Sequence, residues 1–471
     1  MKVLSVTSEC APLVKTGGLA DVAGALPGAL AQEGIEMRTL LPGYRDVMAR
    51  LKEPETLHRF KTLQGAPARI LAERVEGVDL LVLDAPHLFD RAGSLYLSPA
   101  GEDWPDNAER FAALSRAAAD IAAGALADWQ PDIVHAHDWQ AALAPYYMRN
   151  GAVPSIMTIH NIAFQGLAPA KSRAKLGIDK ADFTPEGLEY WGEISALKAG
   201  LTFATKLTTV SPSYAEELME PHFGMGLDGV LRKRRDDLSG VLNGIDTGVW
   251  NPATDPLIKP FKTPRGKKKN KALLRDAFDL PEAQGPLCIV ISRMTEQKGL
   301  DLLLEALPVL TSKGGQLALL GTGSPELETA FQELAARELN VSVKITYDES
   351  LAHKMIAGGD AILVPSRFEP CGLTQLMGLA YGTVPLVALT GGLRDTVISA
   401  SHAALARGVA TGLQCLPGSV EALRNALAKL CLLYADPITW AQIARNAMAH
   451  PVGWESSAKE YANLYRSMKA A

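Results

Sequence analysis

A lysine and two glycines near the start of the chain form a pattern that suits a bound anion. They stand in the string Lys15-Thr16-Gly17-Gly18-Leu19-Ala20-Asp21-Val22, between a β-branched run and an alanine- and leucine-rich run. Glycine lets a ligand approach the backbone closely, and the N–H groups at a helix start carry partial positive charge. The pattern predicts an anion contact at Lys15, Gly17 and Gly18. A tight turn with a solvated lysine is the alternative.

Two cations follow a second apolar run. Arg293 comes directly after Leu287 to Ser292, and Lys298 stands five residues later, at the start of a predicted helix. Two such cations can neutralise a diphosphate and stabilise its additional charge as it leaves. Taken singly, each could be an ordinary surface cation.

One carboxylate stands in the string Ser366-Arg367-Phe368-Glu369-Pro370-Cys371-Gly372-Leu373-Thr374-Gln375. A predicted strand ends just before it, and the proline and glycine predict a turn that leads into a helix. Glu369 can bind sugar hydroxyls and oppose positive charge that develops at an anomeric carbon. A helix-capping glutamate is the alternative.

Histidines follow two further predicted strands, in His135-Ala136-His137-Asp138-Trp139 and in Thr158-Ile159-His160-Asn161. Because residues two apart on a strand share a face, a metal site at the first pair is an alternative. The sequence has no Asp-x-Asp pair for a metal-bound sugar nucleotide, so no metal is expected. The interpretation that we prefer has Asp138, His160 and Asn161 contact a sugar.

Common nucleotide-cofactor patterns are incomplete. Gly321-Thr322-Gly323-Ser324 follows a predicted strand, but Glu326 occupies the place of the third glycine of a dinucleotide fingerprint. The chain also has no Gly-x-x-x-x-Gly-Lys-Ser/Thr string, which argues against a P-loop kinase or ATPase. We therefore expect no cofactor.

The elements that position these residues alternate between short apolar runs and helical stretches. In the first half the predicted strands are 2–8, 79–83, 133–137, 155–159 and 207–211, with helices at 19–31 and 107–127. The second half repeats the alternation at 287–292, 317–320, 341–345, 361–364 and 385–389. This order is typical of parallel sheets covered by helices on both faces, in which ligands bind at the carboxyl ends of the strands.

Three other segments bound the architecture. The charged stretch 165–190 is predicted to be an insertion outside the main sheet, and the lysine-rich stretch 251–272 a solvated linker or surface loop. Apolar residues at helical spacing in 454–468 predict a helix that packs one face on a domain. The predicted domains are 1–245 and 246–450, and the family resemblance given below implies that 451–471 packs back on the first of them.

Composition excludes several classes of partner. A chain of 471 residues with a net charge of −5 lacks the basic excess of nucleic-acid binders, and no apolar run approaches the ~20 residues that span a bilayer. Its five cysteines are scattered without Cys-x-x-Cys spacing, which argues against disulfide or zinc frameworks. We expect a cytoplasmic protein with reduced thiols, binding neither nucleic acid nor membrane.

The motifs together resemble the bacterial glycogen synthases and plant starch synthases. The resemblance rests on the strings that contain Lys15, His135, His160, Arg293 and Glu369. It also includes Val210-Ser211-Pro212-Ser213-Tyr214 and Leu242-Asn243-Gly244-Ile245-Asp246, and it follows one order over the whole chain. It implies a GT-B fold, with two Rossmann-like doubly wound parallel-sheet domains facing a central cleft. It also implies transfer of glucose from ADP-glucose to the non-reducing 4-OH of an α-1,4-glucan, with retention of configuration and without a metal.

The resemblance also implies roles for individual residues. Arg293 and Lys298 would hold the diphosphate, Lys15, Gly17, Gly18 and Asp21 the phosphates or donor sugar, and Tyr347 would lie beside adenine. Asp138, His160, Asn161 and Asn243 would line the glucose and acceptor region, which Tyr96 would also reach. Glu369 and the turn of Cys371, Gly372, Leu373 and Thr374 would hold the donor sugar, and His160, Glu369, Lys298 and Arg293 would be the catalytic group.

Two other functions remain open at this point. The first is a different retaining GT-B sugar-nucleotide transferase, such as a sucrose-forming or trehalose-forming enzyme. The second is a catalytically silent glucan-binding protein of the same fold. The Lys-Thr-Gly-Gly-Leu string favours glucan elongation over the first. The presence of Lys15, His160, Arg293, Lys298 and Glu369 argues against the second.

Overall fold

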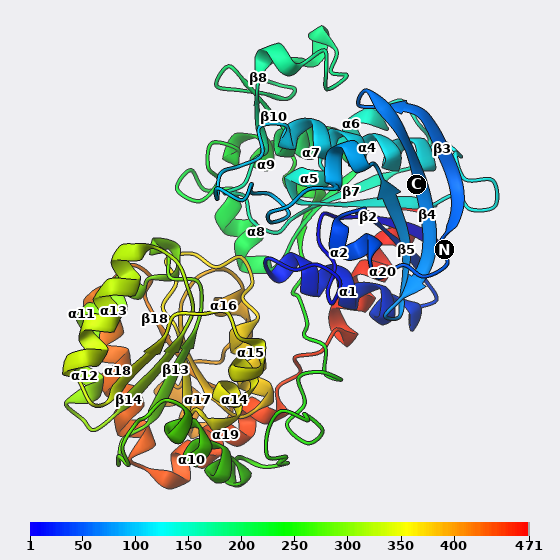
Figure 1. Ribbon diagram of the computed structural model, residues 1–471. Coiled ribbons are helices and arrows are strands. Elements are labelled where there is room, and N and C mark those ends of the chain that lie inside the picture. The colour runs from blue at the N-terminus through cyan, green and yellow to red at the C-terminus, as the bar shows by residue number, and fades with distance from the viewer. Residues whose placement is uncertain (470–471) are drawn as a thin grey trace. The chain divides into compact units, whose positions relative to one another are not determined.

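The computed structural model describes residues 1–469. The chain divides into two compact units (Figure 1). Unit 1 comprises Met1–Asn243 and the C-terminal residues from Trp454 onward, and unit 2 comprises Gly244–Gly453. The chain thus enters unit 2 once and returns to unit 1 for its last helix.

Unit 1 is built on a nine-stranded sheet of order β12-β11-β7-β6-β1-β2-β5-β4-β3. Its strands are β1 (Lys2–Val6), β2 (Glu36–Pro42), β3 (Glu55–Leu63), β4 (Ala66–Val75), β5 (Val78–Asp84), β6 (Ile133–His137), β7 (Ser155–Ile159), β11 (Lys206–Thr209) and β12 (Leu238–Gly240). The seven strands from β12 to β5 are parallel, and β4 and β3 add an antiparallel edge. The predicted parallel core is confirmed, while the antiparallel edge was not predicted.

Helices cover both faces of this sheet. The helices of unit 1 are α1 (Gly18–Ala31), α2 (Arg45–Met48), α3 (Pro86–Phe89), α4 (Asn107–Ala122), α5 (Asp138–Ala141), α6 (Leu143–Tyr147), α7 (Ala196–Phe203), α8 (Pro212–Leu218), α9 (Asp228–Lys233) and α20 (Glu455–Lys469). Helices α1 and α20 bury their apolar faces in one cluster with Val3, Ile133 and Ile156, and α4 packs on the opposite face (Figure 1). The predicted C-terminal helix is therefore present and belongs to unit 1.

A second, small sheet lies outside the main one. It has the order β8-β10-β9, with β8 (Leu167–Pro169), β9 (Glu189–Tyr190) and β10 (Glu193–Ser195) all antiparallel. Seven residues separate it from the end of β7, and it leads into α7. The segment 165–190 is thus outside the main sheet, as predicted, but it contains ordered strands.

Unit 2 is built on a six-stranded parallel sheet of order β15-β14-β13-β16-β17-β18. Its strands are β13 (Leu287–Ile291), β14 (Gln316–Leu320), β15 (Val341–Lys344), β16 (Ala361–Val364), β17 (Val384–Ala388) and β18 (Leu413–Cys415). Its helices are α10 (Lys268–Ala277), α11 (Leu300–Ala306), α12 (Pro308–Thr311), α13 (Pro325–Arg337), α14 (Glu349–Gly358), α15 (Thr374–Ala380), α16 (Gly391–Thr396), α17 (His402–Ala406), α18 (Val420–Tyr434) and α19 (Pro437–Ala449).

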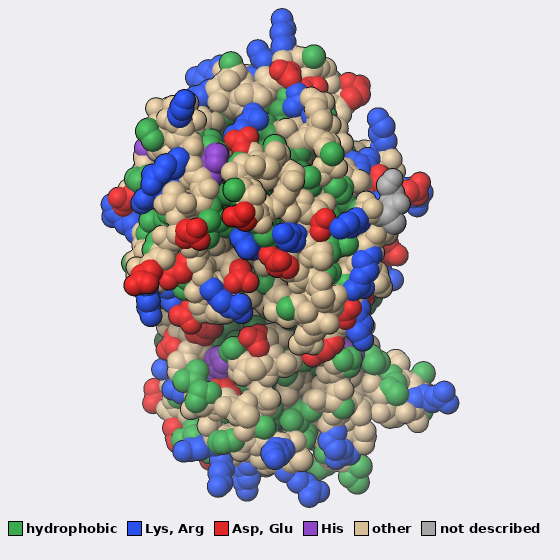
Figure 2. Space-filling model, turned by 90° about the vertical axis from the view of Figure 1, so that its right-hand side faces the viewer, with side chains coloured by type: hydrophobic (Ala, Val, Ile, Leu, Met, Phe, Trp, Pro, Cys, Tyr) green, Lys and Arg blue, Asp and Glu red, His purple; other side chains and the backbone are tan. Residues whose placement is uncertain are grey.

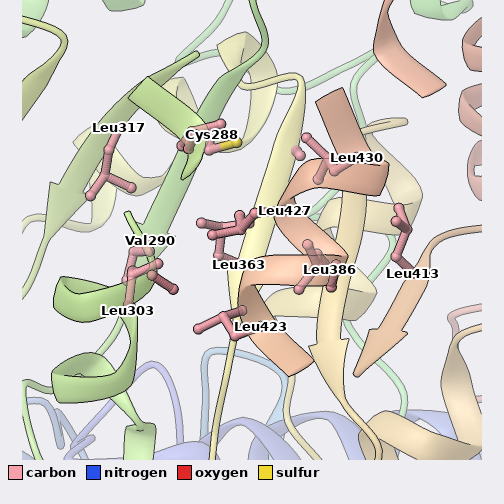
Figure 3. Close-up of a cluster of buried hydrophobic side chains, with 14 of the residues drawn as sticks. Cys288, Val290, Leu303, Leu317, Leu363, Leu386, Leu413, Leu423, Leu427 and Leu430 are labelled. Atoms are coloured by element: carbon pink, nitrogen blue, oxygen red, sulfur yellow. The ribbon is translucent and has the colours of Figure 1, made fainter. Parts of the chain in front are cut away.

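Alternate residues of β13, β14 and β16 enter two different cores. On β13, Cys288 and Val290 join one cluster and Leu287 and Ile289 the other, because successive strand side chains point to opposite faces. Figure 3 shows the first cluster, in which Leu423, Leu427 and Leu430 of α18 point at the strands. The prediction that helices cover both faces of the second sheet is confirmed.

The lysine-rich stretch 251–272 is not a solvated linker throughout. Lys267 is buried, and its ammonium group donates to the carbonyl oxygens of Ile356 and Tyr381 at 3.0 and 3.1 Å and to Thr383 Oγ1 at 2.6 Å. Burial lowers the pKa of Lys267 to about 7. The prediction was wrong here because lysine composition alone cannot show that three oxygens will meet one ammonium group.

Basic and acidic side chains are interspersed over most of the face drawn in Figure 2, and the charged side chains along its lower edge are basic. Within residues 1–469, no helix has both the length and the apolar composition that crossing a membrane requires.

Candidate active site

The predicted site residues of unit 1 follow the carboxyl ends of neighbouring strands. Glu9 lies beyond β1, Asp138 directly follows β6, and His160 directly follows β7. Because β1, β6 and β7 are adjacent and parallel, their carboxyl ends open at the same edge of the sheet. The structure therefore places these groups at the edge where a doubly wound sheet binds its ligands.

Glu9 organises this edge, although sequence reasoning missed it. Its carboxylate accepts hydrogen bonds from the backbone N–H groups of Thr16 and Gly17, at 2.5 and 3.2 Å, and from Thr16 Oγ1 at 2.5 Å. The Tyr96 hydroxyl donates to the same carboxylate at 2.6 Å, and Ser8 Oγ lies 2.8 Å from that hydroxyl. Glu9 thus fixes both the Lys-Thr-Gly-Gly loop and Tyr96.

This network corrects one part of the prediction for the loop. Gly17 was predicted to contact an anion, but its N–H donates to the Glu9 carboxylate, as does that of Thr16. Lys15 and Gly18 remain exposed. Apart from its two chain neighbours, no described residue has a heavy atom within 4 Å of the place where a Cβ on Gly17 would stand. Lys15 Nζ lies 2.8 Å from Asp21 Oδ1. A ligand can therefore meet the lysine and the bare glycine backbone.

Asp138 holds the residues after β7. Its Oδ1 accepts from the backbone N–H of His160 at 2.6 Å and from that of Asn161 at 3.3 Å. Asp138 adopts a left-handed φ of 54° and is buried, and burial raises its pKa to about 7. The carboxyl group therefore positions the His160–Asn161 backbone, in addition to any contact that it makes with a sugar.

Three histidine rings run behind this edge. His137 Nδ1 lies 3.0 Å from His160 Nε2, and the rings of His135 and His137 are 4.1 Å apart. Burial lowers the pKa of His135 and of His160 to about 3 and that of His137 well below its ordinary value, so all three are neutral. The His160 imidazole can therefore offer hydrogen bonds but no positive charge at neutral pH.

The pair His135 and His137 does not present four free nitrogens to a metal. His135 Nδ1 lies 2.7 Å from Tyr465 Oη of α20, and its Nε2 lies 2.5 Å from Thr158 Oγ1. Both nitrogens are therefore already hydrogen-bonded. The pair connects β6 to β7 and to the C-terminal helix.

Two asparagines complete the predicted set in unit 1. Asn161 is half-buried, and its side-chain oxygen accepts from the N–H of Ala163 at 3.0 Å. Asn243, the last residue of the first segment of unit 1, is buried, and its Oδ1 has no hydrogen-bond partner within the described residues. A buried amide oxygen without a partner fits a ligand or water contact.

In unit 2 the two cations follow the carboxyl end of β13, as predicted. Arg293 is exposed, and within residues 1–469 its guanidinium group has no hydrogen-bond or ion-pair partner. Lys298 ends the short 3₁₀ helix Glu296–Lys298, and its Nζ lies 2.5 Å from Glu369 Oε2. One cation is thus fully available to an anion, and the other is shared with the predicted carboxylate.

Glu369 is buried and held from two sides. Besides Lys298, Ser366 Oγ donates to its Oε2 at 3.0 Å. The backbone N–H of Arg367 donates to the carbonyl of Gln297 at 2.8 Å, so the loop that carries Glu369 is also tied to the 3₁₀ helix of Lys298. The alternative of a helix cap does not hold, because α15 begins five residues later, at Thr374, with Leu373 as its N-cap residue.

The turn after Glu369 depends on Gln375. This residue ends the Ser366–Gln375 string, but the sequence did not predict a role for it. Gly372 has φ of 73° and leads through Leu373 into α15. The fully buried Gln375 amide donates to the carbonyl oxygens of Cys371 and Gly372, both at 3.0 Å. It therefore fixes the conformation of the Cys371–Thr374 turn.

Tyr347 lies apart from these groups along the chain. It stands between β15 and α14, is 74% exposed, and its hydroxyl lies 3.4 Å from Glu349 Oε2. An exposed ring at the carboxyl end of a strand is available for stacking on a planar base.

The fold and this arrangement define a class of protein. Each unit is a doubly wound parallel-sheet domain with polar and charged groups at the carboxyl edge, the architecture of the GT-B glycosyltransferases. The solved catalytic domain of starch synthase IV from Arabidopsis thaliana, bound to ADP and acarbose, is 30% identical and superposes with a TM-score of 0.88, over 100% of this chain and 99% of that one. The sucrose-phosphate synthase of Thermosynechococcus elongatus, 19% identical with a TM-score of 0.60, shares the fold.

Family comparisons identify the particular group. Residues 2–233 match the model of the starch synthase catalytic domain, and residues 275–447 match that of the glycosyl transferases group 1. The chain is 58% identical to the glycogen synthase of Paracoccus denitrificans over 100% of both chains, and 59% identical to that of Jannaschia sp. over 99% of both. It therefore belongs to the glycogen and starch synthase family and is a hexosyltransferase.

Proposed function

We propose that this chain is a glycogen synthase that transfers glucose from ADP-glucose to the non-reducing 4-OH of an α-1,4-glucan, with retention of configuration. The observation that carries the proposal is the pair of cations at the carboxyl end of β13, Arg293 unpaired within the described residues and Lys298 paired with Glu369. A diphosphate leaving group gains negative charge as the glycosidic bond breaks, and fixed cations stabilise that charge. The full-length glycogen synthase relatives support this assignment.

Unit 2 then binds the donor. Arg293 and Lys298 hold the diphosphate, Tyr347 stacks on adenine, and the Cys371–Thr374 turn contacts the sugar and phosphates. Glu369 accepts hydrogen bonds from the donor sugar and opposes the positive charge that develops at its anomeric carbon. Its ion pair with Lys298 couples the sugar contact to the phosphate contact.

Unit 1 binds the acceptor and the donor glucose. Lys15 and the Gly17–Gly18 backbone contact phosphate or sugar, with Asp21 holding the lysine side chain. The hydroxyl-binding groups are Asp138, His160, Asn161 and Asn243, and the Tyr96 hydroxyl reaches the same edge through Glu9. Because His160 is neutral, it orients hydroxyl groups rather than supplying charge.

The mechanism needs neither a metal nor a covalent nucleophile in this proposal. The acceptor hydroxyl attacks the anomeric carbon on the face that the diphosphate leaves, and the departing phosphate takes the hydroxyl proton. The new C–O bond forms as the old one breaks, which preserves the α configuration. Arg293 and Lys298 provide the positive charge that a divalent cation would otherwise supply.

A single assay tests the proposal. Purified protein incubated with glycogen and labelled ADP-glucose is expected to lengthen α-1,4 chains, with lower kcat/KM for UDP-glucose and the same rate in EDTA. Transfer to fructose or glucose phosphate instead of glycogen would identify a different retaining transferase. Binding of glycogen without any transfer would identify a silent glucan-binding protein.

The role of Gln375 leads to a separate prediction. Gln375→Glu replaces the amide donor by a carboxylate, which cannot donate to the Cys371 and Gly372 carbonyl oxygens and is repelled by them. Because both hydrogen bonds are lost, we expect KM for ADP-glucose to rise by roughly 10- to 100-fold, at about one factor of ten for each bond. Steady-state kinetics with varied donor would measure it.

Asn446→Asp is the matched control for this change. Asn446 lies in α19, outside the donor turn. Its side-chain amide also donates to two backbone carbonyl oxygens, those of Gly408 and Ala410. If both variants raise the donor KM equally, Gln375 has no special role in the donor turn.

A further inference from the structure

The loop that carries Glu369 also carries an arginine whose side chain bonds to another loop. Arg367 stands two residues before Glu369, between β16 and α15. Its Nη1 donates to the carbonyl oxygen of Glu296 at 2.7 Å. The same guanidinium group donates to both carboxylate oxygens of Asp301, from Nη1 at 2.7 Å and from Nη2 at 2.6 Å. Both partners belong to the chain that follows β13.

These two partners lie on either side of Lys298 in the sequence. Glu296 begins the 3₁₀ helix that Lys298 ends, and Asp301 lies in the first turn of α11. Gly299 between them has φ of 66°, so the chain turns directly after Lys298. A three-residue 3₁₀ helix has few hydrogen bonds of its own to fix it. Arg367 therefore holds the segment that carries Lys298 at both of its ends.

Backbone contacts join the same two loops. The N–H of Arg367 donates to the carbonyl of Gln297 at 2.8 Å, and the Gln297 side-chain amide donates to the carbonyl of Phe368 at 3.3 Å. A Cβ on Gly299 would stand 2.1 Å from the carbonyl oxygen of Pro365, which requires glycine at this close approach. Because β13 and β16 are neighbours in the sheet, the loops that follow them pack as one element.

The charge of Arg367 is compensated within this element. The hydrogen bonds between the two side chains lower the pKa of Asp301 and raise the pKa of Arg367, so both groups are charged at neutral pH. An arginine paired with a carboxylate offers little net charge to a diphosphate, in contrast to Arg293. Its planar guanidinium group instead fixes the direction of several hydrogen bonds at once, which suits it to hold two loops together.

We propose that Arg367 and Asp301 are positioning residues for the transfer reaction, which set the separation between the Lys298 ammonium group and the Glu369 carboxylate. The inference rests on the proposed roles of Lys298 and Glu369 at the donor. These two groups lie 2.5 Å apart but come from different loops, so their geometry depends on what joins the loops. The Arg367–Asp301 pair makes this connection without contacting the substrate.

Alanine variants of the pair test the proposal. Arg367→Ala is expected to lower kcat about tenfold, because displacing a reacting group by 1 Å can cost about 100-fold and the remaining backbone contacts limit the shift. Asp301→Ala should show a similar loss. The double variant should lose no more than Arg367→Ala alone, because either single change already breaks the shared pair. KM for glycogen should stay unchanged, since unit 1 binds the acceptor in the proposed function.

Two conservative variants distinguish positioning from a direct contact with the diphosphate. Asp301→Asn removes the charge that compensates Arg367, so a direct contact predicts tighter ADP binding. Positioning predicts the opposite, a roughly 3- to 10-fold weaker ADP affinity in calorimetric titration, the effect of about one lost hydrogen bond. Arg367→Lys keeps the positive charge but cannot form the paired bonds of a guanidinium group, so it should recover little of the lost kcat.

Arg234→Ala is the matched control for the loss of an arginine that joins two segments. Arg234 also bonds to a carboxylate, that of Asp237, and to backbone carbonyl oxygens, those of Leu201 and Ala204. It precedes β12, at the amino end of that strand and away from the carboxyl edge. We expect Arg234→Ala to lower the thermal unfolding midpoint as much as Arg367→Ala does, with unchanged kcat and ADP affinity.

Three results would overturn the inference. The first is wild-type kcat and ADP affinity in Arg367→Ala. The second is full recovery of kcat by Arg367→Lys, which would show that charge alone matters. The third is tighter ADP binding in Asp301→Asn, which would place Arg367 on the diphosphate itself.

Binding measurements keep this test separate from that of the proposed function. Titration with ADP requires no turnover, and titration with inorganic pyrophosphate reports on Lys298 even if the donor carries another base. A wild type that binds either anion but transfers no glucose would contradict the proposed function. The affinities of the Arg367 and Asp301 variants for the same anions would still decide the role of the pair.

Discussion

Arg293→Ala is expected to lower kcat by roughly 10²–10³, with no loss of thermal stability. Removing one preorganised group that stabilises transition-state charge typically has an effect of that size. The guanidinium group has no partner within residues 1–469, so its removal breaks no contact that the described chain makes. Steady-state kinetics and a thermal unfolding curve on the same preparation would measure both quantities.

Lys298→Ala should lower kcat by a similar factor but also destabilise the protein. Lys298 Nζ is paired with the buried Glu369 carboxylate, which would then keep only Ser366 as a donor. Leaving a buried charged group with fewer partners costs on the order of 1–3 kcal/mol. The contrast between the two variants therefore separates a free binding cation from one that also holds the site together.

Arg407→Ala is the control for the first variant, since Arg407 is likewise an exposed arginine of unit 2. It should leave kcat unchanged. Near-normal turnover in Arg293→Ala, or a loss of stability as large as that of Lys298→Ala, would contradict the assignment of Arg293 to the diphosphate.

The sequence predicts the parallel strands well, because their signal is local. Buried parallel strands are continuous apolar runs such as Leu287 to Ile291, and they need no knowledge of distant residues. The antiparallel strands β3 and β4 escaped prediction because their residues are mostly half-exposed and mixed in polarity. Their place at the sheet edge comes from pairing with β5, which is a non-local contact.

The candidate site shows the same division. Strand ends followed by polar residues predict Asp138, His160, Arg293 and Glu369, because each position depends only on its own strand. Glu9 was missed because its role depends on residues elsewhere in the chain. Its carboxylate accepts four hydrogen bonds, which come from Thr16, Gly17 and Tyr96. A lone carboxylate inside an apolar run was the available signal, since a buried charge is kept only where partners exist.

Trp191 illustrates a third case. Nothing in the string Glu189-Tyr190-Trp191-Gly192-Glu193 indicates a turn at tryptophan rather than a longer strand, because aromatic residues favour strands. The turn becomes visible only in the backbone, where Trp191 and Gly192 both have positive φ. Only the structure identifies residues whose backbone conformation differs from the one that their type prefers. Such residues are good candidates for a functional role.

Glu369 distinguishes the same-face mechanism from one with a covalent intermediate, and its substitution should have the second large effect. Retention of configuration requires either attack on the leaving-group face or two inversions through a nucleophile on the opposite face. In the structure both observed contacts of the carboxylate reach Oε2, from Lys298 Nζ and from Ser366 Oγ. A carboxylate engaged in this way suits hydrogen bonding and charge stabilisation.

Glu369→Gln is therefore expected to retain measurable activity, about tenfold below wild type, because the amide oxygen can still accept from Lys298 and from sugar hydroxyls. Glu369→Ala should lose roughly 10²–10³ in kcat, since both the contacts and the negative charge disappear. Glu282→Gln, which alters an exposed carboxylate paired with Arg275, should leave turnover unchanged.

Intact-protein mass spectrometry of the wild type and of Glu369→Gln, quenched during turnover with ADP-glucose, completes this test. A binding role for Glu369 predicts that neither protein gains the mass of a glucosyl group. A glucosyl adduct located at Glu369 in the wild type, with an inactive glutamine variant, would require the double-inversion mechanism. The assignment of Arg293 and Lys298 to the leaving diphosphate would survive that result, because both mechanisms expel the same group.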